Sequence, residues 1–288
     1  MKNKLLYSSV FVLVLLALLA LPLAFGEDVS TSVSIGTSEP EVWNIYFTPT
    51  VQIDLSSCGN VTVWCNATVM DANGWNDIQT VNATFWAESE TDEGSPNNNS
   101  NHYTNSSCNL NGGSGSTVQA NCSFTLRYYA IPANWTCAMY ATDTASLIGS
   151  NSSNVTINSL ISLDAENAIN FGSLSPGATS PADMNNTVTN CGNVRMDLNL
   201  SGTNLTNTSA TVTNITVDRV NYNVTNYSQT YNVTMTMLSG TSTKADLNLA
   251  KRTNGASTSK TYWKISIPAS IENLIYEGTV TFTAVTDS

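Results

Sequence analysis

Apolar and polar residues alternate along most of this chain, a pattern typical of strands rather than helices. The clearest run is residues 60–70, where the odd-numbered residues are apolar and most even-numbered ones are polar. Such a strand buries one face and exposes the other. Comparable runs occupy residues 50–55, 79–87, 117–128, 135–142 and 154–161, and then 161–171, 187–200, 210–217, 230–238, 245–249, 262–267 and 276–285.

Turn-forming residues separate these runs, as in residues 71–74 (Asp-Ala-Asn-Gly) and 111–115, and no amphipathic helix of convincing length interrupts them. The predicted fold class is therefore all-β, with two consecutive antiparallel β-sandwich domains after an N-terminal signal peptide. We place the signal peptide at residues 1–26, a disulfide-linked sandwich at residues 27–158 and a second sandwich at residues 159–288.

The first residues have the features of a secretory signal. Lys2 and Lys4 precede an apolar run from Val10 to Leu21, and small residues precede Glu27. This order predicts cleavage and export, and hence an extracellular protein of the cell surface. The alternative is an uncleaved anchor, because the apolar stretch approaches the roughly 20 residues that a membrane span needs. The protein would then contact the membrane only through this uncleaved N-terminal segment.

The chain is acidic, with 21 Asp and Glu residues against 10 Lys and Arg residues. Loss of two lysines with the leader would change the formal net charge from −11 to −13. No Lys or Arg occurs between Glu27 and Leu126, so the chain lacks the basic stripe that binding to nucleic acid or anionic lipid requires. Charged residues make up only 11% of the chain, so its polarity comes mainly from Asn, Ser and Thr.

Six cysteines in an exported chain indicate disulfides. No CxxC pair occurs and His102 is the single histidine, which argues against zinc, haem and iron–sulfur centres. The alternation places Cys65 and Cys137 on the inward faces of their strands. We therefore expect a bridge between these two cysteines that joins the two sheets of the first sandwich.

The other cysteines are less constrained. Cys108 and Cys122 flank the Gly- and Ser-rich turn at residues 111–115, so we expect them to join the two strands of a hairpin. The sequence leaves Cys58 and Cys191 open, because they could pair with each other, stay free or crosslink to another chain.

The chain is rich in Asn-x-Ser/Thr motifs, which are acceptors for N-glycosylation. Their number, seventeen, is about twice what random placement of these residues would give. An Asn- and Thr-rich outer strand face would create some of them without any modification, but we expect sugar at several, since bulky glycans solubilise a surface so poor in charge. The motifs begin at Asn60, Asn66, Asn82, Asn98, Asn105, Asn121, Asn134, Asn151, Asn154, Asn185, Asn199, Asn204, Asn207, Asn214, Asn223, Asn226 and Asn232.

Two parts of the sequence carry a family resemblance. A first domain with a bridge between Cys65 and Cys137 looks like an immunoglobulin-like (Ig-like) or fibronectin-like sandwich. The string VTVWCNATVMDANGWNDI, together with NFGSLSPGATS and NTVTNCGNV, resembles Ig-like modules of secreted archaeal cell-surface glycoproteins. Trp135 departs from the antibody pattern, because it stands two residues before Cys137, where a tyrosine is expected. The resemblance implies extracellular scaffolding or adhesion and brings no catalytic residue.

Acidic side chains could bind calcium, and we expect no other cofactor. Asp71, Asn73 and Asp77 occupy one turn and could offer hard oxygen ligands. A second acidic cluster follows the next predicted strand and contains Glu88, Glu90, Asp92 and Glu93. The sequence is not an EF-hand, so the alternative is a turn and a solvated acidic tip.

Catalysis is not expected, because the single histidine lies among asparagines in a predicted loop and nothing fixes the separation of two carboxylates. The sequence therefore predicts a non-catalytic structural glycoprotein of a surface layer, sheath or filament, whose partners are other copies of itself or other surface proteins. The alternative is an adhesin or glycan-binding module that uses aromatic side chains. The aromatic candidates are Trp75, Trp86, Tyr103, Tyr128 and Tyr129.

Residues 28–38 form a further alternating run, with Val29, Val33 and Ile35 on one face and serines on the other. This segment could be the first strand of its own sandwich, or it could add to the exposed sheet edge of a neighbouring subunit. Pro40 and Pro49 separate it from residues 51–55, which could serve as the first strand instead.

Overall fold

The structure of the protein is a computed structural model that describes residues 26–210, 214–225, 228–253 and 255–287. It is all-β, and its helical content is limited to two single 3₁₀ turns, η1 (Trp75–Asp77) and η2 (Val217–Arg219), within those ranges. The predicted signal peptide falls on residues 1–25 and Gly26, almost wholly outside the described residues. Within the described ranges no helix is long and apolar enough to cross a membrane.

Contacts divide the chain into residues 1–36 and residues 37–288. In the first unit, residues 26–36 form no strand and are all exposed. In the second unit, the buried apolar residues form two separate cores, one within residues 42–157 and the other within residues 188–265. The predicted domain boundary near residue 159 falls between these cores and stays a prediction.

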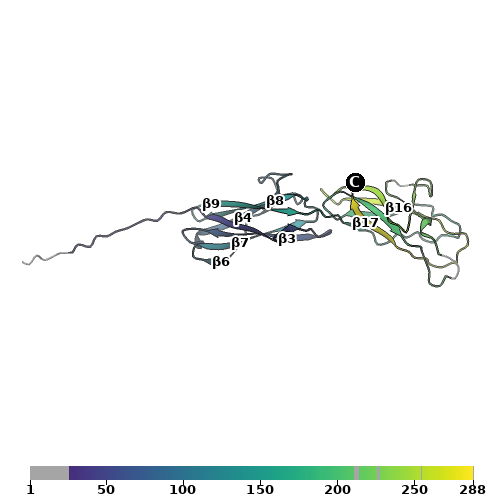
Figure 1. Ribbon diagram of the computed structural model, residues 1–288, viewed down its shortest axis with the longest axis horizontal. Coiled ribbons are helices and arrows are strands. Elements are labelled where there is room, and N and C mark those ends of the chain that lie inside the picture. Colours follow the sequence, from purple (N-terminus) through teal and green to yellow (C-terminus); the bar gives the residue numbers. More distant parts are fainter. Residues whose placement is uncertain (1–25, 211–213, 226–227, 254, 288) are drawn as a thin grey trace, which may run out of the picture. The chain divides into compact units, whose positions relative to one another are not determined.

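The first core lies between two sheets with strand orders β1-β3-β7-β6 and β2-β9-β8-β4-β5. Every strand pair in them is antiparallel except β2 with β9. In Figure 1, β4, β8 and β9 face β3, β6 and β7. The strands are β1 (Glu41–Thr48), β2 (Gln52–Ile53), β3 (Asn60–Met70), β4 (Ile78–Ala87), β5 (His102–Asn105), β6 (Asn109–Ser114), β7 (Thr117–Arg127), β8 (Asn134–Asp143) and β9 (Ile148–Ile157).

Aromatic rings from both sheets fill the centre of this core. Phe85 of β4 contacts Phe124 of β7 and Trp135 of β8, with ring centroids 5.3 and 4.9 Å apart. Each such buried side chain contributes about 1.5–3 kcal/mol of burial free energy. The period-two alternation read from the sequence therefore places the same residues inside the sandwich.

The second core lies between sheets with strand orders β10-β11-β16-β13-β14 and β15-β12-β17, all of antiparallel pairs. Trp263 of β16 and Leu198 of β12 are fully buried, one from each sheet. The all-β sandwich architecture predicted from the sequence is confirmed. The strands are β10 (Leu163–Ala165), β11 (Met184–Asn190), β12 (Met196–Gly202), β13 (Val220–Asn223), β14 (Thr236–Met237), β15 (Thr243–Leu249), β16 (Thr258–Ile265) and β17 (Val280–Thr286).

The first strand was not anticipated. The alternation pointed to residues 50–55, but β1 is Glu41–Thr48 and only Gln52–Ile53 of the expected run pairs, as β2. Asn44 has a positive φ of 50°, and the β1–β3 register shifts between Trp43 and Tyr46. This bulge breaks the period-two pattern, which is why the sequence does not indicate the strand.

The expected strand at residues 187–200 is two strands, β11 and β12, with a turn between them. The side-chain oxygen of Asn190 accepts a hydrogen bond of 2.8 Å from the Gly192 N–H, which turns the chain. Gly192 is required there, since a Cβ atom would lie 2.1 Å from the Leu160 carbonyl oxygen. The strand expected at residues 210–217 is also wrong where it is described, because Ile215 makes only an isolated bridge with Leu205 before η2.

Three disulfides crosslink the chain. Cys65 is joined to Cys137 between the two sheets and Cys108 to Cys122 across the β6–β7 hairpin, the same pairs that the sequence indicates. The pairing that the sequence leaves open is also present, as the disulfide between Cys58 and Cys191. It connects the turn before β3, in the first sandwich, with the turn after β11, in the second.

Polar contacts accompany this third disulfide. The side-chain amide of Asn193 donates to the carbonyl oxygens of Ala130 and Asn158, each at 2.9 Å, and its oxygen accepts from the Leu160 N–H at 2.7 Å. The Arg252 guanidinium lies 4.7 Å from the centre of the Tyr129 ring. Asn193 is fully buried, and its hydrogen bonds to Ala130 and Asn158 hold the turn after β11 against the first sandwich.

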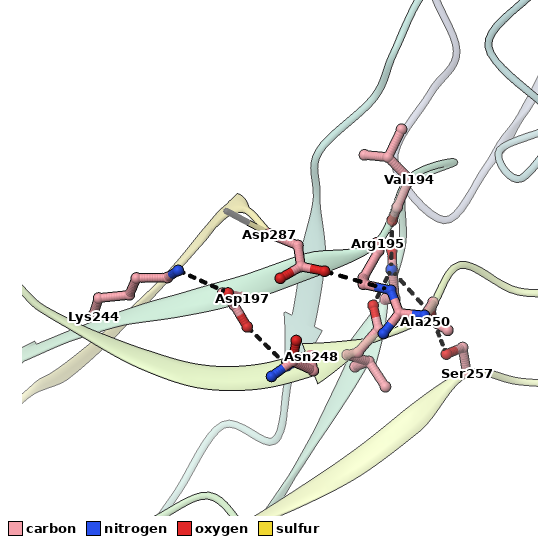
Figure 2. A network of polar contacts seen from close by, with 10 residues as sticks. Val194, Arg195, Asp197, Lys244, Asn248, Ala250, Ser257 and Asp287 are labelled. Atoms are coloured by element: carbon pink, nitrogen blue, oxygen red, sulfur yellow. Dashed lines mark hydrogen bonds and ion pairs between the residues drawn. The ribbon is translucent and has the colours of Figure 1, made fainter.

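The ion pairs found among the described residues all lie in the second sandwich. Figure 2 shows Asp197 of β12 between the Lys244 ammonium, at 3.1 Å, and the Asn248 N–H, which donates to it at 2.8 Å. Arg195 pairs with Asp287 at 3.5 Å, just beyond the end of β17. Burial acts to raise the pKa of Asp197, but the Asn248 hydrogen bond and the Lys244 ammonium together hold it below its ordinary value.

Candidate metal centre

Three aspartates converge at one end of the first sandwich. Asp71 follows β3, Asp77 ends η1 just before β4, and Asp143 ends β8. One carboxylate oxygen from each lies within 4.8 Å of the other two. Asp71 and Asp143 are completely buried and Asp77 is partly buried, so the cluster is largely withdrawn from solvent.

Backbone pairing fixes the position of each carboxylate. The Asp71 N–H donates to the Ser116 carbonyl at 2.8 Å, which keeps Asp71 beside the β6–β7 turn. The Thr144 N–H donates to the Asp77 carbonyl at 2.9 Å, which continues the β4–β8 ladder past its last pair, Ile78 with Asp143. Three separate turns are thus held together by the ends of the two sheets.

Each carboxylate uses one oxygen for a local hydrogen bond. Asp71 Oδ1 accepts from the Asn73 N–H at 2.7 Å, Asp143 Oδ1 accepts from the Leu147 N–H at 2.7 Å, and Asp77 Oδ1 accepts from the Thr144 hydroxyl. The second oxygens of Asp71 and Asp143 are buried and have no hydrogen-bond partner among the described residues. Buried unpaired acceptors are costly and call for a partner.

In the part of the chain that the structure describes, no ion pair involves any of these three aspartates. Arg127 is the single Lys or Arg between Glu27 and Val194, and its guanidinium donates to Asn60 Oδ1. Carboxylates this close repel one another when ionised, unless a proton or a cation lies between them. Calcium prefers carboxylate and carbonyl oxygens in a flexible shell of six to eight ligands, completed by water. The geometry therefore fits a hard divalent cation.

The structure brings together only part of the predicted ligand set. Asp71 and Asp77 are in the cluster, whereas Asn73 is exposed and its side-chain oxygen accepts from the Ser38 N–H at 2.8 Å. The predicted ligands of the acidic loop, Glu88, Glu90 and Asp92, do not belong to this cluster of the described residues.

Asp143 is the ligand that sequence reasoning missed. It directly follows a predicted strand, at the start of the turn Asp143-Thr144-Ala145-Ser146, which is the available sequence signal. That signal is not sufficient, because only the β4–β8 register brings residue 143 next to residue 77, 66 positions earlier in the chain.

A second polar site lies on the outer face of the β4-β8-β9 sheet, under the acidic loop. It is a cavity of about 330 Å³ lined by Trp86, Glu88, Glu93 and Tyr140, with Thr136 and serines of β9. Glu88 accepts a hydrogen bond from the Thr136 hydroxyl, and Glu93 accepts one from the Tyr140 hydroxyl. Burial, reinforced by the Glu93 carboxylate, raises the pKa of Tyr140 to about 12.

The aromatic residues proposed from the sequence as a sugar-binding surface are mostly not exposed. Tyr103, Tyr128 and Tyr129 are buried, which corrects that part of the expectation. Trp75 is partly buried and packs against the first core. Trp86 is partly buried and lines the cavity under the acidic loop.

His102 is the first residue of β5 and is buried, contrary to the expectation of a loop position. Its Nε2 atom lies 2.8 Å from the Glu93 carbonyl oxygen and its Nδ1 atom 3.3 Å from Asn97 Oδ1. These contacts place His102 against the loop between β4 and β5.

No protein-family model matches this sequence, and no curated protein matches it. A carbohydrate-binding module of the β-sandwich superfamily aligns with 86% of this chain and 97% of its own at 10% identity, with a TM-score of 0.27. The major pilin subunit BcpA of Bacillus cereus aligns with 87% of this chain and 67% of its own at 7% identity, with a TM-score of 0.26. The C-terminal domain of the Streptococcus agalactiae protein BspA covers 85% and 95% of the two chains at 12% identity, with a TM-score of 0.22.

Proposed function

We propose that this protein is a non-catalytic structural module that is exported and assembles at a cell surface. The observation that carries the proposal is the disulfide between Cys58 and Cys191, which covalently joins two sandwiches that each have their own core. Such a link limits separation of the two sandwiches under mechanical load. Three disulfides in one chain are typical of an oxidising, extracellular environment.

The candidate metal centre supports the same proposal. A cation between Asp71, Asp77 and Asp143 would tie together the turns at one end of the first sandwich, as calcium does in many extracellular modules. It would stabilise the fold rather than take part in a reaction. His102 is buried against the loop between β4 and β5, and the proposal gives it a structural role there.

Fractionation of native cells, followed by electron microscopy of the fraction that contains the protein, tests the proposal. We expect the protein in a surface-derived fraction, as part of a layer, sheath or filament. Recovery of the protein only in the cytosol, or only as dispersed monomers, would overturn it.

The proposed module carries sugar on its exposed asparagines. The exposed acceptor residues are Asn60, Asn98, Asn134, Asn151, Asn154, Asn185, Asn204, Asn214 and Asn232, and the partly exposed ones are Asn82, Asn105, Asn121, Asn199, Asn207 and Asn223. Asn66 is withdrawn from this set, since it is 4% exposed and its side-chain oxygen accepts from Asn121 at 2.6 Å. Asn226 lies outside the described residues. Intact-mass measurement before and after deglycosylation tests this part.

Glycan binding is the second candidate function, and the cavity beside Trp86 favours it. An aromatic face can stack on a sugar ring while the carboxylates of Glu88 and Glu93 accept hydrogen bonds from sugar hydroxyls. Trp86→Ala should abolish binding to a responsive polysaccharide. Trp64→Ala, on the strand β3 of the opposite sheet, is the matched control and should leave binding unchanged. Equal binding by the wild type and W86A would reject this function.

A further inference from the structure

The second sandwich has an open side at β17. In the sheet β15-β12-β17, β17 pairs with β12, and no other strand of the described residues pairs with it. An edge strand presents a row of backbone N–H and C=O groups that can pair with an added strand.

Burial decreases from β12 towards this edge. Leu198 and Leu200 of β12 are fully buried, whereas their register partners on β17, Ala284 and Phe282, are only partly buried. The inward-facing side chains of β17 are apolar, but no described strand lies along the edge of β17 that faces away from β12. One more strand at this edge would complete the core.

A groove of about 2090 Å³ lies beside β17. Its apolar lining includes Phe171 and Leu174, which follow β10, Ile275, which precedes β17, and Phe282. Ile275 is 76% exposed. An added strand would cover these apolar side chains.

The N-terminal unit contains a segment with the complementary pattern. Val29, Val33 and Ile35 share one face of an extended chain and are 81%, 86% and 83% exposed. Serines at 30, 32 and 34 occupy the other face. The first sandwich begins its own sheet at β1, so these residues are not needed there. This segment, which forms no strand in its own copy, thus has an exposed apolar face that no core covers.

We propose that residues 28–35 of one copy add as a strand to the β17 edge of a second copy, with Val29, Val33 and Ile35 in the groove. The occupant is thus a second copy of this chain. This inference rests on the proposed structural function and names the contact that builds the assembly. Each copy carries one donor segment and one acceptor groove, so the contact is heterologous and can propagate into a filament.

Paired substitutions on the donor segment test the contact in the exported full chain, with sedimentation velocity and electron microscopy as readouts. Val33→Asp places a charge on the face that enters the groove and should raise the concentration needed for assembly by at least about 100-fold. Ser34→Asp adds the same charge to the opposite face and should change it by less than about threefold. Both variants should retain all three disulfides.

Substitutions in the groove test the acceptor. Ile275→Asp alters an exposed groove residue and should prevent assembly, whereas Val51→Asp, which is equally exposed but outside the groove, should not. V33D retains its groove and I275D retains its donor segment. A mixture of these two variants should therefore form a one-to-one dimer that does not grow.

Two results would overturn the inference: V33D assembling at the wild-type concentration, or the V33D and I275D mixture remaining monomeric. Assembly of V33D into native surface structures would reject this contact and leave the proposed function intact. Absence of the wild-type protein from every surface structure would instead reject the proposed function. Dimer formation in the V33D and I275D mixture would still support the contact between the donor segment and the groove in that case.

Discussion

Cys58 and Cys191 form a disulfide between residues 133 positions apart, and so join the two sandwiches of this chain. The Cys58–Cys191 disulfide closes a loop that already contains the Cys65–Cys137 bridge, which shortens its effective length. A loop of this effective length constrains the unfolded chain by about 4 kcal/mol in the entropy model.

Replacing both Cys58 and Cys191 by alanine should lower the free energy of unfolding by about 4 kcal/mol, because that constraint is lost. Calorimetry should then show the two sandwiches melting at separate temperatures. The matched control replaces Cys108 and Cys122, which close a loop of only 14 residues within the first sandwich, and should affect that sandwich alone. Unchanged melting of the Cys58 and Cys191 variant would contradict the structural role of this disulfide.

Calcium should raise the melting temperature of the first sandwich, because it neutralises Asp71, Asp77 and Asp143 in the folded state only. At 100 times its dissociation constant the ion would contribute about 2.7 kcal/mol. Asp143→Asn should abolish this gain and, in EDTA, should stabilise the sandwich by removing one repelling charge. Asp92→Asn, in the exposed acidic loop, is the control. A wild-type melting temperature that is equal in calcium and in EDTA would rule out the site.

Tyr140 should ionise near pH 12, because burial and the Glu93 carboxylate both favour its neutral form. Glu93→Gln should lower the Tyr140 pKa, which NMR of ¹³C-labelled tyrosine rings can follow. Tyr103 is an internal control: burial raises its pKa to about 12 as well, without help from Glu93, so E93Q should leave it unchanged. A Tyr140 pKa that does not respond to E93Q would refute the contact.

Asp197 should make the second sandwich sensitive to acid. Its pKa in the folded state is below the ordinary 3.8, so its ionised form stabilises the fold above that pH. This contribution should disappear as the pH falls through the folded-state pKa. Asp197→Asn should flatten the dependence of stability on pH below 4. Asp246→Asn removes the other, exposed partner of Lys244 and should leave that dependence nearly unchanged.

Strands with regular alternation could be predicted closely. The runs at residues 60–70, 79–87, 117–128 and 135–142 correspond to β3, β4, β7 and β8 within one or two residues at each end. β1 could not be predicted, because the bulge at Asn44 disrupts the alternation. The long run across residues 187–200 misled for a different reason: apolar residues continue the alternation on both sides of the turn, although Asn190 and Gly192 are themselves turn-forming residues.

The inward direction of Cys65 and Cys137, and hence their pairing, follows from alternation, which is a local property of the chain. The pairing of Cys58 with Cys191 and the arrival of Asp143 beside Asp77 required the folded protein. Both depend on strand register and on contacts between distant turns. The sequence by itself thus determined which residues face inward, because side chains of a strand alternate by geometry. The tertiary structure alone decided which distant turns meet, because that depends on how whole sheets pair and pack.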